Sequence, residues 1–384
     1  MVIKTKKSFK KSFILLPLIL FLAIYNSIPE KITIFEGQKG AMLFGISAKA
    51  DNYKIGKYDF SIFPHLKTVS VSVLPAAYVI PSGEAIGVKL YTDGVMVIGS
   101  GSVTDSSGKT YEPAKNAGVI AGDRIVAVNG SPVSDIDGLK RLVNAENGHT
   151  ELSIIRGENS LILPVNAVYS EDTNSYLLGL WVRDSAAGIG TMTFYNPENS
   201  TFAAVGHGIC DYDTNLLMKS HSGSINFCRI KSVKKSENGE IGEILGEFSA
   251  KNEGNILLNS ETGIYGNTAS IPDINPVPVA SRFELETGYA ELLCDVDGLG
   301  PRAYKIEITR ISTSAKQSGK SFVFKVTDSA LLEKTGGIVQ GMSGSPILQN
   351  GKLVGAVTHV FVNDASKGYG IFAENMLDTT CMIR

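Results

Sequence analysis

Short apolar runs separated by glycines and polar turns recur along most of the chain. Alternation of apolar and polar residues, which is typical of strands, is found at residues 69–73, 190–195 and 304–309. The composition agrees, because 43% of the residues are hydrophobic and 40 are glycine. The pattern predicts a mostly β protein with many short strands.

The first 28 residues have a different pattern. An uncharged, mainly apolar run at residues 13–24 follows five lysines: Lys4, Lys6, Lys7, Lys10 and Lys11. Its length fits the core of an export signal and falls short of the roughly 20 residues of a membrane span. Tyr25 and Asn26 interrupt any small-residue cleavage site. We expect residues 1–28 to be a signal retained as a membrane anchor, with a cleaved signal as the alternative. The lysines should stay inside, so the rest of the chain should cross the membrane.

A chain of 384 residues should hold two or three domains. Residues 29–76 are expected to form a short β region or linker, and we find no candidate catalytic or binding residues in them. Residues 77–170 predict a PDZ domain, on the run Ala-Gly-Val-Ile-Ala-Gly-Asp-Arg-Ile-Val-Ala-Val-Asn-Gly at 117–130, which is a specific PDZ signature. Residues 175–384 predict a peptidase, and their length fits a chymotrypsin-like double β-barrel.

Helical spacing at residues 135–143 completes the PDZ pattern. A groove between this helix and a strand would take an extended peptide by strand addition. Residues 80–90 resemble the opening strand and carboxylate-binding loop of such a domain. The predicted peptide-binding residues are Gly83, Ala85, Ile86, Gly87 and Val88. Glu84 would oppose a terminal carboxylate, so internal or intramolecular ligands are favoured; the alternative is a PDZ domain that only packs against the peptidase.

The C-terminal part contains Gly341-Met342-Ser343-Gly344-Ser345-Pro346, which fits the Gly-x-Ser-Gly-[Gly/Ser]-Pro pattern around the nucleophile of chymotrypsin-like serine proteases. The glycines permit a tight turn that lifts one hydroxyl and aims backbone N–H groups into one hole. Ser343 is the predicted nucleophile, and the N–H groups of Gly341 and Ser343 are the predicted oxyanion hole. An Asn-Gly turn between the apolar runs that follow predicts that the nucleophile opens a β-hairpin.

A serine nucleophile needs a base and a group that orients the base. His207 is the predicted base, because small residues flank it and leave room for substrate. The other four histidines are in polar stretches (His65 and His149), in a Ser/Gly-rich turn (His221) and after the nucleophile hairpin, at the cleft wall (His359).

The orienting acid is less defined by spacing. Asp328 ends an apolar strand fifteen positions before Ser343. Asp211, Asp295 and Asp297 compete with it, and most aspartates at strand ends only form turns. Spacing alone leaves these four open.

Three segments together resemble one family. Residues 205–211, 327–328 and 335–347 look like the stage IV sporulation protein B (SpoIVB) peptidases of endospore-forming bacteria, and the similarity covers nearly the whole chain. This resemblance implies His207, Asp328 and Ser343 as the catalytic set. Family members act in the space between the two membranes around the forespore. They cleave themselves and a regulator of a membrane-embedded metalloprotease, which leads to processing of sigma-K.

Charge and cysteines limit the other possibilities. The net charge of −2 gives no reason to expect nucleic acid as a partner. Cys210, Cys228, Cys294 and Cys381 form no Cys-x-x-Cys pair, so neither a metal nor another cofactor is expected, and free thiols are favoured over a Cys210–Cys228 bridge. The alternative functions are a non-catalytic PDZ adaptor and a quality-control protease of HtrA type, which the order of the predicted domains disfavours.

Overall fold

The structure is a computed structural model that describes residues 17, 20–22, 25, 31–36, 42–43, 46–47, 54–62, 67–237, 239–312 and 319–380. Most of the predicted signal at residues 1–28 therefore lies outside the described residues. Among the described residues, no helix is long and apolar enough to cross a membrane.

The mostly β fold is confirmed, and its elements fall into four groups. The N-terminal group contains β1 (Lys31–Phe35), β2 (Met42–Leu43), β3 (Ile46–Ser47), β4 (Gly56–Ile62) and β5 (Lys67–Leu74). The first barrel and its edge contain β6 (Tyr78–Pro81), β7 (Ala85–Ser100), β16 (Leu180–Asn196), β17 (Thr201–Ala204), β18 (Ser220–Lys234), β19 (Glu243–Ser260), β20 (Gly263–Asn267) and β21 (Val277–Pro278).

In the sequence, the third group lies between β7 and β16, and it thus divides the first barrel into two segments. It contains β8 (Val103–Thr104), β9 (Thr110–Tyr111), α2 (Pro113–Asn116), β10 (Arg124–Val128), β11 (Ser131–Pro132), α3 (Ile136–Ala145), β12 (His149–Arg156), β13 (Asn159–Asn166), β14 (Val168–Ser170) and β15 (Ser175–Leu177). The second barrel contains β22 (Gly288–Cys294), β23 (Arg302–Ile311), β24 (Phe322–Val326), α4 (Ser329–Thr335), β25 (Pro346–Gln349), β26 (Lys352–Phe361), β27 (Asp364–Phe372) and α5 (Ala373–Thr380).

The second barrel is built from neighbouring segments of sequence. Its strands close in the order β22-β23-β24-β27-β26-β25. Alternating apolar residues point inward, and the aromatic rings of Phe322, Phe324 and Phe372 fill the core. Gly355 and Gly370 lie against the ring of Phe322, where a Cβ atom would come within 2.8 and 2.3 Å of it. The glycines of these strands therefore make room for large core side chains.

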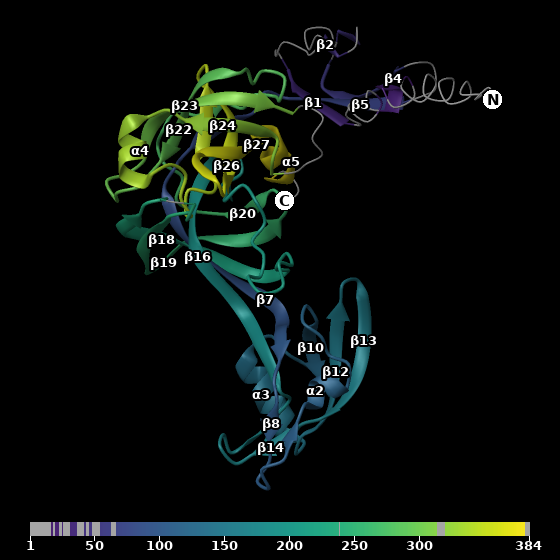
Figure 1. The fold of residues 1–384 in the computed structure, drawn as a ribbon. Helices are drawn as coiled ribbons and strands as arrows, with labels where there is room; N and C mark the ends of the chain where they lie inside the picture. Colours follow the sequence, from purple (N-terminus) through teal and green to yellow (C-terminus); the bar gives the residue numbers. More distant parts are fainter. Residues whose placement is uncertain are drawn as a thin grey trace, which may run out of the picture.

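The first barrel is interrupted in sequence. Its strands pair in the order β7-β18-β19-β20-β17-β16, and β16 pairs back with β7, which closes the ring. Only the first half of β7 and the second half of β16 belong to this ring. The remaining halves continue outward as a two-stranded ribbon into the PDZ-type unit (Figure 1). The predicted double barrel is thus present, with a domain inserted into one hairpin of the first barrel.

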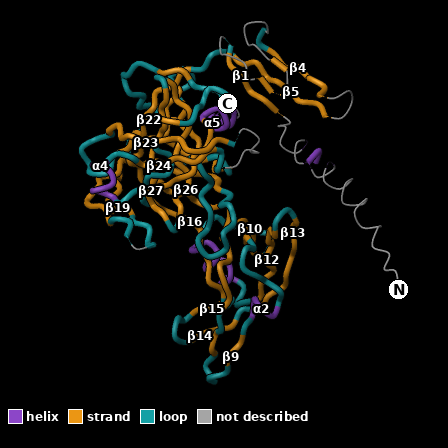
Figure 2. The backbone as a smooth tube through the Cα atoms, turned by 45° about the horizontal axis from the view of Figure 1, so that its top comes forward, coloured by secondary structure: helices purple, strands orange, loops and turns teal. Residues whose placement is uncertain are grey.

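The inserted unit has its own core. Side chains from its strands and from one face of α3 form it, among them Val95, Ile125, Leu139 and Leu152. Helix α3 begins where the sequence predicts, because the Asp135 carboxylate accepts the N–H of Gly138 as an N-cap. Figure 2 shows this unit as a separate body below the two barrels.

The domain boundaries predicted at residues 77–170 are wrong at both ends. Residues Ala85–Leu90 pair with β16 and β18 in the first barrel, and Ile86, Val88 and Leu90 pack in that barrel's core. Conversely, Leu178 belongs to the core of the inserted unit. A local motif is sufficient to identify the domain from its central residues. The domain to which an edge strand belongs depends on its strand pairing, which the local sequence does not show. Residues 29–76, where described, contribute the three-stranded sheet β1-β5-β4.

Candidate active site

His207 follows β17 through a sharp backbone turn. Val205 has φ +71° and Gly206 has φ +73°, so two successive residues are in the left-handed region. This conformation is unusual for a β-branched residue such as Val205 and indicates strain of the kind found at functional sites. A Cβ atom on Gly206 would lie 2.9 Å from the carbonyl oxygen of Val357 in the second barrel. Glycine there lets the two barrels approach closely just before His207.

Ser343 occupies a turn with two left-handed glycines, Gly341 (φ +99°) and Gly344 (φ +95°). A Cβ atom on Gly344 would lie 2.2 Å from the carbonyl oxygen of Thr191 and 2.4 Å from the backbone nitrogen of Val205. No side chain fits there. The predicted hairpin follows as β25 and β26, joined by Asn350 and Gly351.

Strand β16 of the first barrel holds this turn in place. The N–H of Thr191 donates to the carbonyl oxygen of Ser343 (2.9 Å), and the Thr191 hydroxyl donates to that of Gly341 (2.7 Å). The hydroxyl of Thr193 donates to the carbonyl oxygen of Gly344 (2.7 Å). The nucleophile turn of one barrel is therefore positioned by buried threonines of the other.

The two predicted residues meet at one cavity. His207 and Ser343 both line a cavity of about 580 Å³ between the barrels. Its walls are a stretch of β16, the segment that follows His207, and the nucleophile turn; the lining residues include Ser185, Ala186, Ala187, Gly188, Ile189, Tyr212, Gln340 and Gly341. Small side chains along β16 leave room for a polypeptide backbone.

The hydrogen bonds at the cavity define the state of each group. Nδ1 of His207 lies 2.9 Å from the carbonyl oxygen of Gly208. A carbonyl only accepts, so Nδ1 carries the proton and Nε2 has the free lone pair. The Ser343 hydroxyl donates to the carbonyl oxygen of Thr358 (3.0 Å), not to His207. Catalytic hydrogen bonds often tighten only when substrate binds.

A second histidine borders the first. The rings of His207 and His359 have centroids 5.1 Å apart. Burial lowers the pKa of His207, so this imidazole is neutral and able to take a proton at neutral pH. Burial, then repulsion from His207 and Lys320, lowers the pKa of His359 to about 4. Sequence reasoning placed His359 only at the cleft wall, because nothing in its local sequence shows which strand it faces.

Two backbone N–H groups at the nucleophile turn are free. Among the described residues, the N–H groups of Gly341 and Ser343 have no hydrogen-bond partner, whereas those of Met342, Gly344 and Ser345 do. Free N–H groups beside a serine hydroxyl are the chemical requirement for holding an oxyanion.

The structure does not bring Asp328 to His207. The Asp328 carboxylate caps α4, accepting the N–H groups of Ala330 (3.0 Å) and Leu331 (3.1 Å), and it also accepts that of Lys305 (3.2 Å). Strand β24 leads to Asp328, and its cavity end is near Gly319, whose carbonyl oxygen accepts the Thr358 hydroxyl. From there an extended chain of nine residues to Asp328 spans roughly 30 Å. Asp328 is thus at the opposite end of the second barrel.

The competing aspartates have other partners too. Asp295 accepts the N–H groups of Asp297 and Gly298, and Asp297 pairs with Lys334 at 2.6 Å. Among the described residues, no carboxylate hydrogen-bonds to His207. The Gly208 carbonyl oxygen is the group that fixes its ring.

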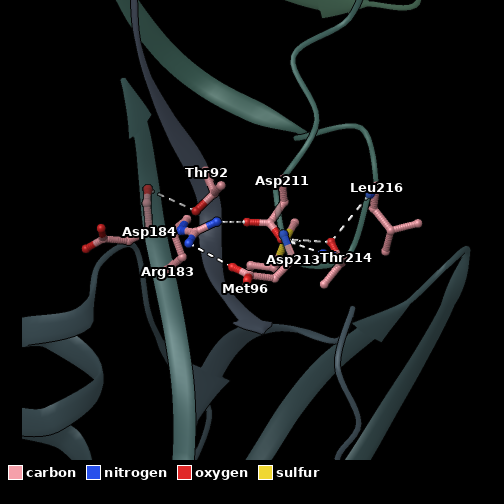
Figure 3. Close-up of polar contacts among 8 residues, drawn as sticks. All are labelled: Thr92, Met96, Arg183, Asp184, Asp211, Asp213, Thr214 and Leu216. Carbon is pink, nitrogen blue, oxygen red and sulfur yellow. Dashed lines mark hydrogen bonds and ion pairs between the residues drawn. The ribbon is translucent and has the colours of Figure 1, made fainter. Parts of the chain in front are cut away.

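Asp211 forms a buried anchor between the ribbon and the segment after His207 (Figure 3). Its fully buried carboxylate pairs with Arg183 of β16, whose other nitrogen is 2.8 Å from Asp213. Burial opposes the charge, but hydrogen bonds from Thr214 and the ion pair with Arg183 lower the pKa of Asp211. The Thr214 hydroxyl also contacts the sulfur of Met96 on β7 (3.8 Å). These contacts join the segment after His207 to the ribbon.

The peptide-binding loop predicted at Gly83, Ala85, Ile86, Gly87 and Val88 is wrong. These residues lie in the first barrel; Gly83 donates its N–H to Met192, and a Cβ atom on Gly87 would lie 2.4 Å from the ring of Phe248. They have no access to α3, and Glu84 instead accepts the hydroxyl of Tyr195.

The groove of the inserted unit is formed by other residues. It lies between α3 and the start of β16, in a mostly apolar pocket of about 220 Å³ lined by Leu139, Lys140, Val143, Leu178 and Gly179 among others. Gly179 has φ +67°, which turns the chain into β16. The sequence feature that could have indicated this groove is the apolar run Leu-Leu-Gly-Leu at residues 177–180, at the start of β16. It lies beyond residue 170, the predicted end of the PDZ domain.

Two family models match parts of the chain. The model of the SpoIVB peptidase S55 family matches residues 174–377, and a PDZ domain model matches residues 106–156. No curated protein matches the chain. The solved structures that are similar include two of the Rv3671c protease, inactive form, one of them from M. tuberculosis H37Rv. They are 13% and 14% identical, cover 51% of this chain and 83% and 84% of theirs, and have a TM-score of 0.29. The family match covers more than half of the chain and includes both His207 and Ser343, so the protein belongs to the SpoIVB peptidase S55 family and is a serine peptidase.

Proposed function

We propose that this serine peptidase is an exported endopeptidase of sporulation signalling that acts between the two membranes around the forespore. Its substrates are itself and a regulator of a membrane-embedded metalloprotease, and their cleavage leads to sigma-K activation. The observation that carries the proposal is the family match over residues 174–377, which includes both His207 and Ser343 at their shared cavity. The basic and apolar N-terminus supports export and contact with the membrane.

In the proposed mechanism, the Ser343 hydroxyl rotates away from the carbonyl oxygen of Thr358 and donates to Nε2 of His207. The serine oxygen attacks the scissile carbonyl while His207 takes its proton. The free N–H groups of Gly341 and Ser343 hold the oxyanion. His207 then gives the proton to the leaving amine, and water hydrolyses the acyl-enzyme by the same steps.

The ring of His207 must keep one orientation throughout. In this structure the Gly208 carbonyl oxygen accepts the Nδ1 proton and maintains the required tautomer. Asp328, which the family resemblance implies as the third member, would have to act through a rearranged second barrel. We therefore place the mechanism on His207 and Ser343.

A sporulating host without its own peptidase of this kind tests the proposal. The full chain should restore cleavage of the regulator and processing of sigma-K on immunoblots, and His207→Ala should not. A chain that reacts with a fluorophosphonate but restores neither step would contradict the sporulation role alone. Restoration by both chains would instead favour the PDZ adaptor.

A further inference from the structure

One edge of β16 is open over most of its length. In the cavity, residues Ser185 to Thr191 pair with β7 on one side, whereas β17 pairs with β16 only from Met192 onward. The N–H of Met192 donates to the carbonyl oxygen of Glu84 in line with this ladder. By alternation, the backbone groups of Ser185, Ala187 and Ile189 point away from β7.

These outward backbone groups face the cavity. Among the described residues, the N–H and C=O groups of Ser185, Ala187 and Ile189 have no hydrogen-bond partner beyond β7. The next outward residue, Thr191, already donates its N–H to Ser343. An unpaired strand edge that ends at the nucleophile is a template for an extended polypeptide.

The same edge also borders the groove of the inserted unit. Residues Leu180 to Val182 pair with β7, and their other edge faces α3. At the start of this edge, the described residues offer no partner for the N–H groups of Leu178 and Gly179. Free N–H groups at a left-handed glycine can hold a carboxylate, and Lys140 lines the same pocket.

We propose that one substrate segment occupies both sites at once: its free C-terminus, with an apolar last residue, docks at Leu178–Leu180 while its scissile bond lies at Ser343. This inference rests on the proposed peptidase mechanism. It adds a fixed distance between the cleaved bond and the C-terminus of the substrate. Strand β16 runs from the inserted unit into the first barrel (Figure 1). Residues that line the groove and residues that line the cleft therefore lie along one strand.

The direction of the chain fits the chemistry. A C-terminus at the start of β16 requires the substrate to run antiparallel to the strand, with earlier residues nearer to Ile189. The residues after the scissile bond then lie between β16 and the segment that follows His207. The leaving amine is thus next to His207, which must protonate it.

Arg183 does not occupy this edge, and the neighbouring Asp184 joins the strand to α3, since its carboxylate accepts the N–H of Ile136 (2.9 Å). Arg183 pairs across the ribbon with Met96, so its side chain is on a face of the ribbon with Asp211, not on its edge (Figure 3). Register shifts between Trp181 and Val182 and between Arg183 and Ser185 interrupt the ladder at two points. From Leu180 to Ile189 the strand spans roughly 30 Å, so the cut is expected about 8–11 residues before the C-terminus.

Peptide libraries with defined C-termini measure this distance. Incubation of the full chain with such a library, followed by mass spectrometry, should give cuts clustered about 8–11 residues before the end. For a peptide that is cut, four extra C-terminal residues should slow cleavage of the original bond about tenfold and direct cutting to a bond nearer the new end. A C-terminal amide should slow it as well.

Two charge-reversal variants on α3, one inside the groove and one outside it, test whether the groove binds the C-terminus. Lys140→Glu, on the exposed part of α3 that lines the groove, should remove the dependence on the C-terminus. Arg141→Glu, at a neighbour that is also exposed but does not line the groove, should behave as the unchanged protein. Cuts unrelated to the C-terminus, by a preparation that reacts with a fluorophosphonate, would overturn the shared-strand inference alone. A preparation that neither reacts nor cuts would overturn the peptidase mechanism and this inference with it.

Discussion

The two barrels of this peptidase reach similar architectures from different arrangements of sequence. The second barrel runs without interruption from β22 to β27 and presents Ser343 on a local turn. The first barrel is divided by the inserted unit, and its β7 and β16 meet only in three dimensions. The nucleophile could therefore be found from a hexapeptide, whereas the cleft wall opposite it depends on pairing between residues about 100 positions apart.

The difference also separates what each barrel contributes. The second barrel supplies the nucleophile and two free N–H groups. The first supplies the base, the threonines that hold the nucleophile turn, and a strand that continues into the groove. Neither barrel alone contains a complete site, so substitutions at the contacts between them should also lower activity.

The largest effect is expected at the nucleophile. Ser343→Ala should lower turnover on the order of a million-fold, since the attacking hydroxyl is lost. Ser345→Ala is the matched control, because Ser345 is fully buried and has only a long hydroxyl contact with Thr191 (3.5 Å). Peptide cleavage and fluorophosphonate labelling measure both. Loss with Ser345→Ala but not with Ser343→Ala would mean that the other serine attacks.

The contact between the barrels comes next. Gly344→Ala should destabilise the protein by about 3 kcal/mol and lower activity roughly a hundredfold, because its Cβ atom would collide with Thr191 and Val205. Gly351→Ala has a comparable φ of +74° but meets no atom within 4 Å, so it should cost only about 1 kcal/mol and keep activity. Thermal unfolding and initial rates measure these effects. Equal behaviour of the two variants would show that backbone strain, not the contact between barrels, is what matters.

A smaller effect is expected where the ribbon holds the segment after His207. Arg183→Met should cost about 2 kcal/mol, because it leaves the buried Asp211 carboxylate without its ion pair, and should lower activity about tenfold. The control is Arg156→Met in the inserted unit, where Arg156 pairs with the equally buried Asp123. It should cost similar stability and keep catalytic activity on short amidated peptides. If both variants lost activity alike, the effect would come from stability rather than from the position of His207.

The smallest effect is expected at the far end of the second barrel. Asp328→Ala should cost about 1 kcal/mol through loss of the cap on α4, and Asp328→Asn should cost little, since asparagine also caps helices. Both should keep nearly normal turnover. A carboxylate that oriented His207 would behave otherwise, with a loss of roughly ten-thousand-fold for Asp328→Asn. That result, with the fold intact by circular dichroism, would return Asp328 to the mechanism.

Local sequence determined much of this protein. The motif at 341–346 and the Asn-Gly turn define the nucleophile hairpin, because short turns are fixed by the residues within them. The small residues around His207 and the helical spacing at 135–143 are equally local, and the structure places His207 at the cavity and the helical residues in α3. Alternation of apolar residues was sufficient for the mostly β class.

Tertiary structure decided the rest. Residues 85–90 alternate as well as any strand of the inserted unit, and only pairing with β16 and β18 assigns them to the first barrel. Spacing left Asp328 as one of four candidates for the orienting acid and the family resemblance selected it, yet the length of β24 carries it away from the cavity. Spacing along a chain limits how far apart two residues can be, but the path of the strands between them sets where each one lies.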